Sequence, residues 1–258
     1  MILEEAILSR ANLLFGDESM AKVKDTKVII FGVGGVGSWC AESLVRSGVR
    51  HITIVDSDEV CVSNINRQRM ATVDSIGEVK VEALKKILLS ILPDAEIEAI
   101  REVYCEDTAE RFRLEEYDYI IDAIDSLKDK VLLIENATRT KAKFFSSMGA
   151  ALKIDPTKIR VAEFWNVTGC PLARALRQRF KKLKRRPAKK FQCVYSEELL
   201  ENKVIPSFGE EEGFCKGFPL NSNRDAAKAR VNGSIMHITA IFGMTLAGLV
   251  LKDIYDRS

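Results

Sequence analysis

The 258-residue sequence is long enough for one large domain or two modest ones with a substantial buried core. Its hydrophobic content of 47% and charged content of 29% are ordinary for a soluble globular protein, and its net charge of +2 indicates no partner by itself. The six cysteines are widely spaced and form no CxxC pair. This argues against a zinc ribbon or a dense disulfide framework, and favours reduced thiols in a cytoplasm.

From Lys27 to about Gly149, short apolar runs alternate with helical patterns. Strands are expected at 28–31, 51–56, 95–100, 117–124 and 144–149, with helices at about 36–47, 78–92, 106–114 and 128–141. Strands that alternate with helices imply right-handed βαβ units. The pattern therefore predicts a Rossmann-like, doubly wound α/β fold, whose mainly parallel sheet has helices on both faces.

The regular alternation of strands and helices ends after residue 150. Strands are expected at 159–165 and 191–196, with a basic helical stretch between them, and the polar segment from about 201 to 231 predicts long loops. An apolar helix is expected over about 233–255; its short apolar run and the absence of an aromatic belt favour a buried or dimer-facing helix over a membrane span. We therefore expect a nucleotide-binding region at 1–150 and a C-terminal extension at 151–258, packed as one continuous domain.

A glycine loop follows the first predicted strand. Gly32, Gly34 and Gly37 have the G-x-G-x-x-G spacing, and Gly35 lies between them. Such glycines permit a tight turn and let backbone N–H groups approach a phosphate at the N-terminus of the next helix. Asp56 ends the second strand, where a carboxylate can accept hydrogen bonds from ribose hydroxyls. These features predict a nucleotide site without separating NAD from ATP.

The polar stretch DSDEVCVSNINRQR at 56–69 favours ATP. Hydride transfer has no use for several cationic and amide groups beside a ribose, whereas departing pyrophosphate needs its charge neutralised. Asn64, Arg67 and Gln68 can donate to phosphate oxygens, and Lys80 adds a cation at the start of the next helix.

An acidic element, DAIDS, ends the fourth predicted strand. Asp125 in this element would lie at the sheet edge where ligands bind in such folds, and a carboxylate there suits a Mg²⁺ ion that bridges phosphates. The alternative is that Asp122 and Asp125 only cap the following helix.

These motifs together resemble the ubiquitin-activating-enzyme-like superfamily, whose members adenylate a carboxylate with ATP and Mg²⁺. The resemblance covers about residues 8–150 well. It implies an ATP site that consists of the glycine loop and of Asp56, Asp58, Asn64, Arg67, Gln68 and Lys80. It implies catalytic roles for Arg67, Lys80, Asp125 and Arg10, with Asp125 supporting the metal. Arg10, in the motif SRANLLFG, corresponds to an arginine that these enzymes take from the N-terminus of a partner subunit, which implies a homodimer.

The activators of sulfur-carrier proteins in this superfamily carry two CxxC pairs, which this sequence lacks. The segments GVGSW, VCVSNINRQ, IDPTKIRVAEFWNVTGCPLARALRQRFKK and CVYSEE instead resemble the tRNA threonylcarbamoyladenosine dehydratases, over most of the chain. That resemblance implies adenylation of the threonyl carboxylate of the modified adenosine in tRNA, followed by ring closure within the same nucleoside and net loss of water. A sulfur-transfer protein as a further partner stays open.

A run of basic residues agrees with an RNA substrate. The segment 174–190 holds ten lysines or arginines and no acid, which indicates a localised anion-binding stripe. Candidate tRNA contacts are Arg177, Lys181, Lys182, Lys184, Arg185 and Arg186. The alternative is a solvated helix face or loop.

Three other functions stay open at this point. The chain could adenylate the C-terminal carboxylate of a sulfur-carrier or ubiquitin-like protein. It could be an RNA-binding or redox adaptor that kept the nucleotide fold without turnover. It could also be an NAD oxidoreductase, which the polar stretch at 56–69 disfavours.

Overall fold

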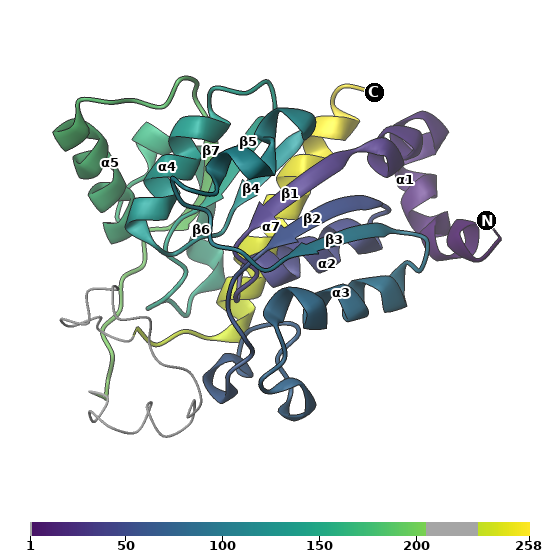
Figure 1. The fold of residues 1–258 in the computed structure, drawn as a ribbon, viewed down its shortest axis with the longest axis horizontal. Helices are drawn as coiled ribbons and strands as arrows, with labels where there is room; N and C mark the ends of the chain where they lie inside the picture. Colours follow the sequence, from purple (N-terminus) through teal and green to yellow (C-terminus); the bar gives the residue numbers. More distant parts are fainter. Residues whose placement is uncertain (1, 205–231) are drawn as a thin grey trace.

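The computed structural model describes residues 2–204 and 232–258 (Figure 1). In these ranges a seven-stranded sheet has the order β3-β2-β1-β4-β5-β7-β6. The strands are β1 (Lys27–Phe31), β2 (His51–Val55), β3 (Glu96–Ile100), β4 (Tyr119–Asp122), β5 (Lys143–Ser147), β6 (Ile159–Glu163) and β7 (Gln192–Ser196). Every neighbouring pair is parallel except β6 and β7, which are antiparallel. The C-terminal part of the chain thus extends the same sheet by two strands.

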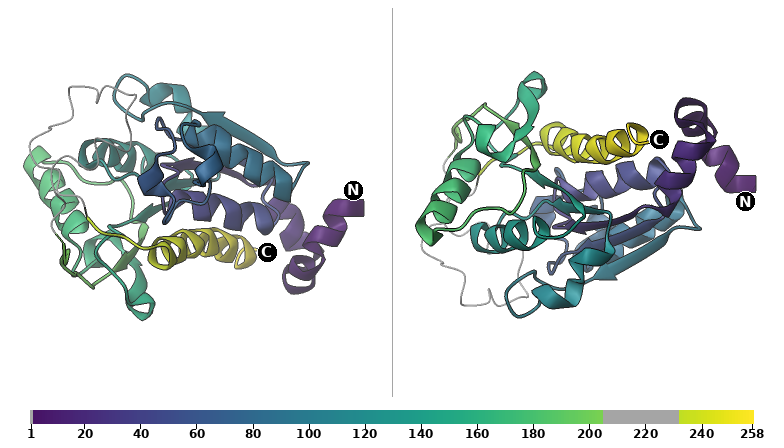
Figure 2. Two further views of the ribbon diagram at one scale, coloured as in Figure 1. Left: turned by 90° about the horizontal axis from the view of Figure 1, so that it is seen from below. Right: turned by 90° about the horizontal axis from the view of Figure 1, so that it is seen from above.

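Helices cover both faces of the sheet, which confirms the doubly wound α/β class. They are α1 (Ile2–Asp25), α2 (Gly37–Arg46), α3 (Lys80–Ile91), α4 (Leu127–Ala137), α5 (Pro171–Leu183) and α7 (Met236–Tyr255). Side chains of α2, α3 and α7 share one core cluster, and those of α4 and α5 share the other. Figure 2 shows α7 alongside α2 on one side of the sheet.

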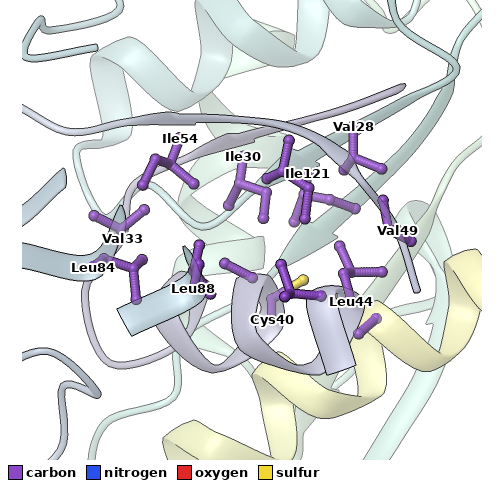
Figure 3. Close-up of a cluster of buried hydrophobic side chains, with 14 of the residues drawn as sticks. Val28, Ile30, Val33, Cys40, Leu44, Val49, Ile54, Leu84, Leu88 and Ile121 are labelled. Atoms are coloured by element: carbon purple, nitrogen blue, oxygen red, sulfur yellow. The ribbon is translucent and has the colours of Figure 1, made fainter. Parts of the chain in front are cut away.

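The central strand β1 is apolar at every position from Val28 to Phe31, without the alternation of a half-exposed strand, because both of its faces are buried there. Val28 and Ile30 point into the cluster with α2 and α3, whereas Ile29 and Phe31 point into the cluster with α4 and α5 (Figure 3 shows the first cluster). A parallel strand between two helical layers buries both of its faces, so both sets of side chains are apolar.

The apolar helix α7 packs closely on α2. A Cβ atom added at Gly243 would lie 2.3 Å from the carbonyl oxygen of Val36, so only glycine permits this approach. By length and composition α7 could cross a membrane, but half of its most apolar window is buried inside this structure. Its N-terminal turn also reaches the glycine loop, because a Cβ at Gly35 would lie 3.2 Å from Thr239.

Two local expectations differ from the structure. The segment 106–114 forms no α-helix but two 3₁₀ turns, Ala109–Phe112 and Leu114–Glu116, separated by Arg113 with φ of 42°. Its buried residues, Phe112 and Leu114, are two positions apart, which is not the spacing of one helix face. Cys61 is disulfide-bonded, whereas Cys40, Cys105, Cys170 and Cys193 are free as expected. Residues 2–25, for which the sequence analysis predicts no element, form two helical segments joined by a kink at Gly16, which has φ of 74°. Most of the predicted polar segment, 205–231, lies outside the described residues.

Candidate active site

The glycine loop connects β1 to α2 at the point where strand order reverses between β1 and β4. Gly32 adopts φ of 83°, and its N–H donates to the carbonyl oxygen of Val55 at 2.8 Å. An added Cβ would lie 2.7 Å from the Ala123 oxygen at Gly32, and 1.9 Å from the Gly32 oxygen at Gly37. These two glycines are therefore required by the turn itself. At Gly34 the nearest atom to an added Cβ is Nε2 of Gln68, in ordinary contact at 3.9 Å, so the turn itself does not require a glycine there.

Asp56 follows β2 and reaches back to the glycine loop. Its Oδ2 accepts the N–H of Val33 at 2.9 Å, and its Oδ1 accepts the N–H of Asp58 at 2.9 Å. These bonds fix the carboxylate beside the loop. Each oxygen keeps a lone pair, so the group could still accept a hydrogen bond from a ribose hydroxyl.

Lys80 begins α3 and is buried, although it is a lysine. Its ammonium lies 3.0 Å from Oδ2 of Asp58, whose side chain is 52% exposed. A backbone hydrogen bond joins the same two residues: the N–H of Lys80 donates to the carbonyl oxygen of Asp58 at 3.0 Å. The aliphatic part of the Lys80 side chain is buried, and its ammonium group lies at the exposed carboxylate of Asp58. The ammonium is therefore near the surface, where it could bind an anion.

The stretch 61–68 folds into a tight turn in which Asn64 has a structural role. Oδ1 of Asn64 accepts the N–H of Cys61 at 3.1 Å, and its carbonyl oxygen accepts the N–H groups of Arg67 and Gln68 at 3.0 and 2.9 Å. The sequence analysis predicts that Asn64 donates a hydrogen bond to a phosphate oxygen. The structure shows that Asn64 also shapes the turn that carries Arg67 and Gln68.

The charges of Arg67 and Asp125, which are nearly 60 residues apart in the chain, interact without a direct ion pair. Nη1 of Arg67 donates instead to the carbonyl oxygen of Ser63 at 2.8 Å and to Oδ1 of Asn66 at 3.0 Å. Burial lowers the pKa of the Arg67 guanidinium, and the nearby charge of Asp125 raises it. The main chain of Arg67 is held from α2, since Nε1 of Trp39 donates to its carbonyl oxygen at 2.9 Å. Asp125 is exposed. The turn after β2 and the end of β4 thus place a cation and a carboxylate at one edge of the sheet.

The side chain of Gln68, beside the glycine loop, has a buried oxygen without a hydrogen-bond partner among the described residues. Its side chain is buried, its Nε2 is the nearest atom to a Cβ added at Gly34, and its Oε1 has no hydrogen-bond partner among the described residues. A buried polar atom without a partner is costly and is uncommon in folded proteins. The site therefore fits a ligand with a hydrogen-bond donor beside the glycine loop.

The two aspartates of DAIDS have different roles. Asp122 is fully buried; its Oδ1 accepts Nζ of Lys130 at 2.9 Å and the N–H of Ile124 at 3.1 Å, and its Oδ2 accepts Oγ of Ser146 at 2.7 Å. Lys130 also donates to the carbonyl oxygen of Ile124 at 3.0 Å. This network holds the segment that leads to Asp125. Ser126 occupies the N-cap position of α4, which leaves the cap alternative without support.

Asp125 is the candidate ligand for the predicted Mg²⁺ ion. In the ranges the structure describes, no group of three or more histidine, cysteine, aspartate or glutamate side chains could hold a metal ion. Mg²⁺ often uses one or two carboxylates together with substrate phosphates and water, so an exposed Asp125 beside a nucleotide fits that donor set.

Arg10 lies far from these residues within one chain. It is exposed on α1, and α1 packs at the amino ends of the strands, where Glu4 binds Arg50 just before β2. Figure 1 shows α1 at the opposite end of the molecule from the turns that follow β2. The structure therefore does not bring Arg10 to the other predicted catalytic residues.

The basic run divides into structural and exposed members. Nη1 of Arg177 donates to the carbonyl oxygens of Phe164 and Val167 at 3.0 and 2.8 Å, so this predicted tRNA contact holds the fold together. Arg185 pairs with the buried Glu135 at 3.2 Å while its own side chain stays 60% exposed. The remaining predicted contacts are exposed: Lys181, Lys182, Lys184 and Arg186.

The ThiF family profile matches residues 8–257. The chain is 35% identical to tRNA threonylcarbamoyladenosine dehydratase of Bacillus subtilis, over 96% of this chain and 98% of the relative. It is 36% identical to the Escherichia coli dehydratase, over 95% of this chain and 92% of the relative.

A solved structure of the E. coli dehydratase TcdA in complex with ATP superposes with a TM-score of 0.82 at 29% identity, covering 98% of this chain and 95% of that one. Adenylyltransferase and sulfurtransferase MOCS3 of Drosophila virilis is 32% identical over only 55% of this chain and 30% of the relative. The chain therefore belongs to the ThiF family, within which its full-length relatives are tRNA threonylcarbamoyladenosine dehydratases.

Proposed function

We propose that this protein catalyses the ATP-dependent cyclising dehydration of N6-threonylcarbamoyladenosine in tRNA. The observation that carries the proposal is the carboxylate of Asp56, fixed against a glycine loop that Gln68 also borders, with the interacting charges of Arg67 and Asp125 at the same edge of the sheet. A cation and a carboxylate at that place serve phosphate chemistry rather than hydride transfer. The full-length similarity to dehydratases, one of them solved with ATP, supports the choice of substrate.

The nucleotide would be bound by the chain's own groups. We place the ribose at Asp56, whose carboxylate is already fixed beside the loop. We place the phosphates against the backbone near Gly34, with Arg67, Nε2 of Gln68 and Lys80 as donors. Asp58 would hold the Lys80 ammonium until a phosphate competes for it.

Mg²⁺, held by Asp125, would neutralise charge on the phosphates when bound. Asp125 has the exposure that a ligand to a hydrated ion requires. The charge of Arg67 interacts with that of the same carboxylate and would share in that neutralisation, and the main chain of Arg67 is held by the bond from Trp39.

The reaction proceeds in two steps. An oxygen of the threonyl carboxylate attacks the α-phosphorus of ATP, and pyrophosphate leaves with its charge balanced by Arg67 and Lys80. Attack on the activated carbonyl carbon from within the same nucleoside then closes the ring and expels AMP. The nucleoside has lost one water overall, and the second step needs no enzyme nucleophile because both reacting groups belong to one molecule.

The placement of Arg10 supports a homodimer. Since Arg10 cannot join Arg67, Lys80 and Asp125 within one chain, we propose that it acts at the site of a second copy. We further propose a cytoplasmic location without stable membrane insertion, because α7 has half of its apolar window buried in the fold. A sulfur-transfer partner remains a weaker proposal that rests on the superfamily resemblance alone.

The test is mass spectrometry of nucleosides from tRNA that carries threonylcarbamoyladenosine, after incubation with the protein, ATP and Mg²⁺. We expect a nucleoside lighter by one water, formed only when ATP is present. No change in that nucleoside with ATP binding confirmed would contradict the proposal. That result would favour adenylation of a protein carboxylate, although relatives with that activity align with only part of the chain.

A further inference from the structure

Trp165 presents its indole ring on the surface. Its side chain is 44% exposed, whereas the preceding Phe164 is fully buried. Both lie in the short turn Phe164–Asn166 that follows β6, the antiparallel edge strand. Large aromatic side chains are usually mostly buried, so an exposed indole in a well-ordered turn can indicate a binding surface.

The turn that carries Trp165 is fixed from three sides. The carboxylate of Glu163 accepts the N–H of Trp165 at 2.9 Å. The ring of Phe164 stacks on that of Phe191 with centroids 5.0 Å apart, and the two backbones are joined by a hydrogen bond of 3.1 Å. Because the backbone on both sides of the indole is held, burying the ring would require breaking core contacts.

Arg177 joins this turn to the basic helix α5. Its guanidinium donates to the carbonyl oxygens of Phe164 and Val167, which lie on either side of Trp165. Arg174 and Lys181, three residues before and four after Arg177, are both exposed. Residues at these spacings lie on one face of a helix, so the face of α5 that contacts the turn also carries a row of cations.

We propose that Trp165 is a stacking platform for an unpaired nucleobase of the tRNA substrate, with Arg174 and Lys181 binding the adjoining phosphates. An aromatic ring beside a row of cations is the combination that binds single-stranded RNA, because every base has a face to stack and every nucleotide a charge to neutralise. A protein partner would find no acid in this part of α5 with which to pair its own cations. The proposal rests on the proposed function in taking tRNA as the substrate.

The first test is binding of tRNA to the full-length protein, measured separately from turnover. Trp165→Ala should weaken binding by roughly 5- to 150-fold, the range for loss of one stacked base, while Trp165→Phe should retain most of the affinity. Trp165→Ala should leave the slope of log Kd against log salt unchanged. Lys181→Ala should lower that slope by about 0.7–0.9, since it removes one phosphate contact.

Tyr255→Ala is the matched control, because Tyr255 is an exposed aromatic residue, 52% exposed, on the last turn of α7. It should bind tRNA like the unaltered protein. Fluorescence gives an independent readout, because the chain has two tryptophans and Trp39 remains in every variant. We expect tRNA to quench part of the emission, and Trp165→Phe to lack that part.

The outcomes separate this proposal from the proposed function. Unchanged tRNA affinity in Trp165→Ala, or quenching as large in Trp165→Phe as in the unaltered protein, would refute the stacking role even if the cyclised nucleoside forms. Loss of affinity and of quenching, with no cyclised nucleoside from the unaltered protein, would support the RNA surface and refute the proposed reaction.

Discussion

Replacing Lys130 with methionine should strongly destabilise the protein. Lys130 and Asp122 both have fully buried side chains, 2.9 Å apart. Methionine keeps most of the side-chain volume but removes the charge, and so leaves the carboxylate of Asp122 buried without a counter-ion. The carbonyl oxygen of Ile124 would lose its donor as well. Breaking a buried pair from one side costs about 3–5 kcal/mol.

That loss can be measured by urea denaturation and by thermal melting. For a chain of this size it corresponds to a Tm lower by roughly 6–20 °C. Lys128→Met is the matched control, because Lys128 is exposed on the same helix and should change stability by less than about 0.5 kcal/mol. The double variant Asp122→Asn/Lys130→Met should regain part of the loss, since it removes both charges. A Lys130→Met variant within about 1 kcal/mol of the unaltered protein, or a double variant less stable than the single one, would refute this reasoning.

Three further predictions concern the active site. Asp125→Ala and Lys80→Ala should each abolish formation of AMP from ATP while circular dichroism shows an intact fold, and turnover retained in either variant would remove that residue from the catalytic set. Arg10→Ala and Lys80→Ala should each be inactive alone but regain activity when co-refolded, because one site of a mixed dimer then has both groups; no recovery would contradict action across the dimer. Gly37→Ala should lower Tm, because the new Cβ would meet a backbone oxygen at 1.9 Å, whereas Gly34→Ala should melt like the unaltered protein and bind ATP more weakly. Equal melting temperatures for the two glycine variants would show that the loop relaxes.

Local signals in the sequence determined the class of fold and the nucleotide loop. The run VIIF is apolar throughout because β1 is buried on both faces, and that pattern can be read from four residues. The glycine spacing could be read in the same way, since Gly32 has φ of 83° and a Cβ at Gly37 would meet the Gly32 oxygen within the turn. The prediction of a helix at 106–114 is wrong because Phe112 and Leu114 reach the same buried cluster from two separate 3₁₀ turns rather than along one helix face.

Only the tertiary structure decided how the charged groups are used. Asp122 and Asp125 look alike in the sequence, yet one is fully buried beside Lys130 and the other is exposed near Arg67. Arg177 belongs to a uniform basic run, but its guanidinium braces the turn of Trp165. The role of a charge depends on its partners and its burial, and these are contributed by segments distant in the chain. A sequence therefore specifies which chemical groups are present, and folding determines which of them meet.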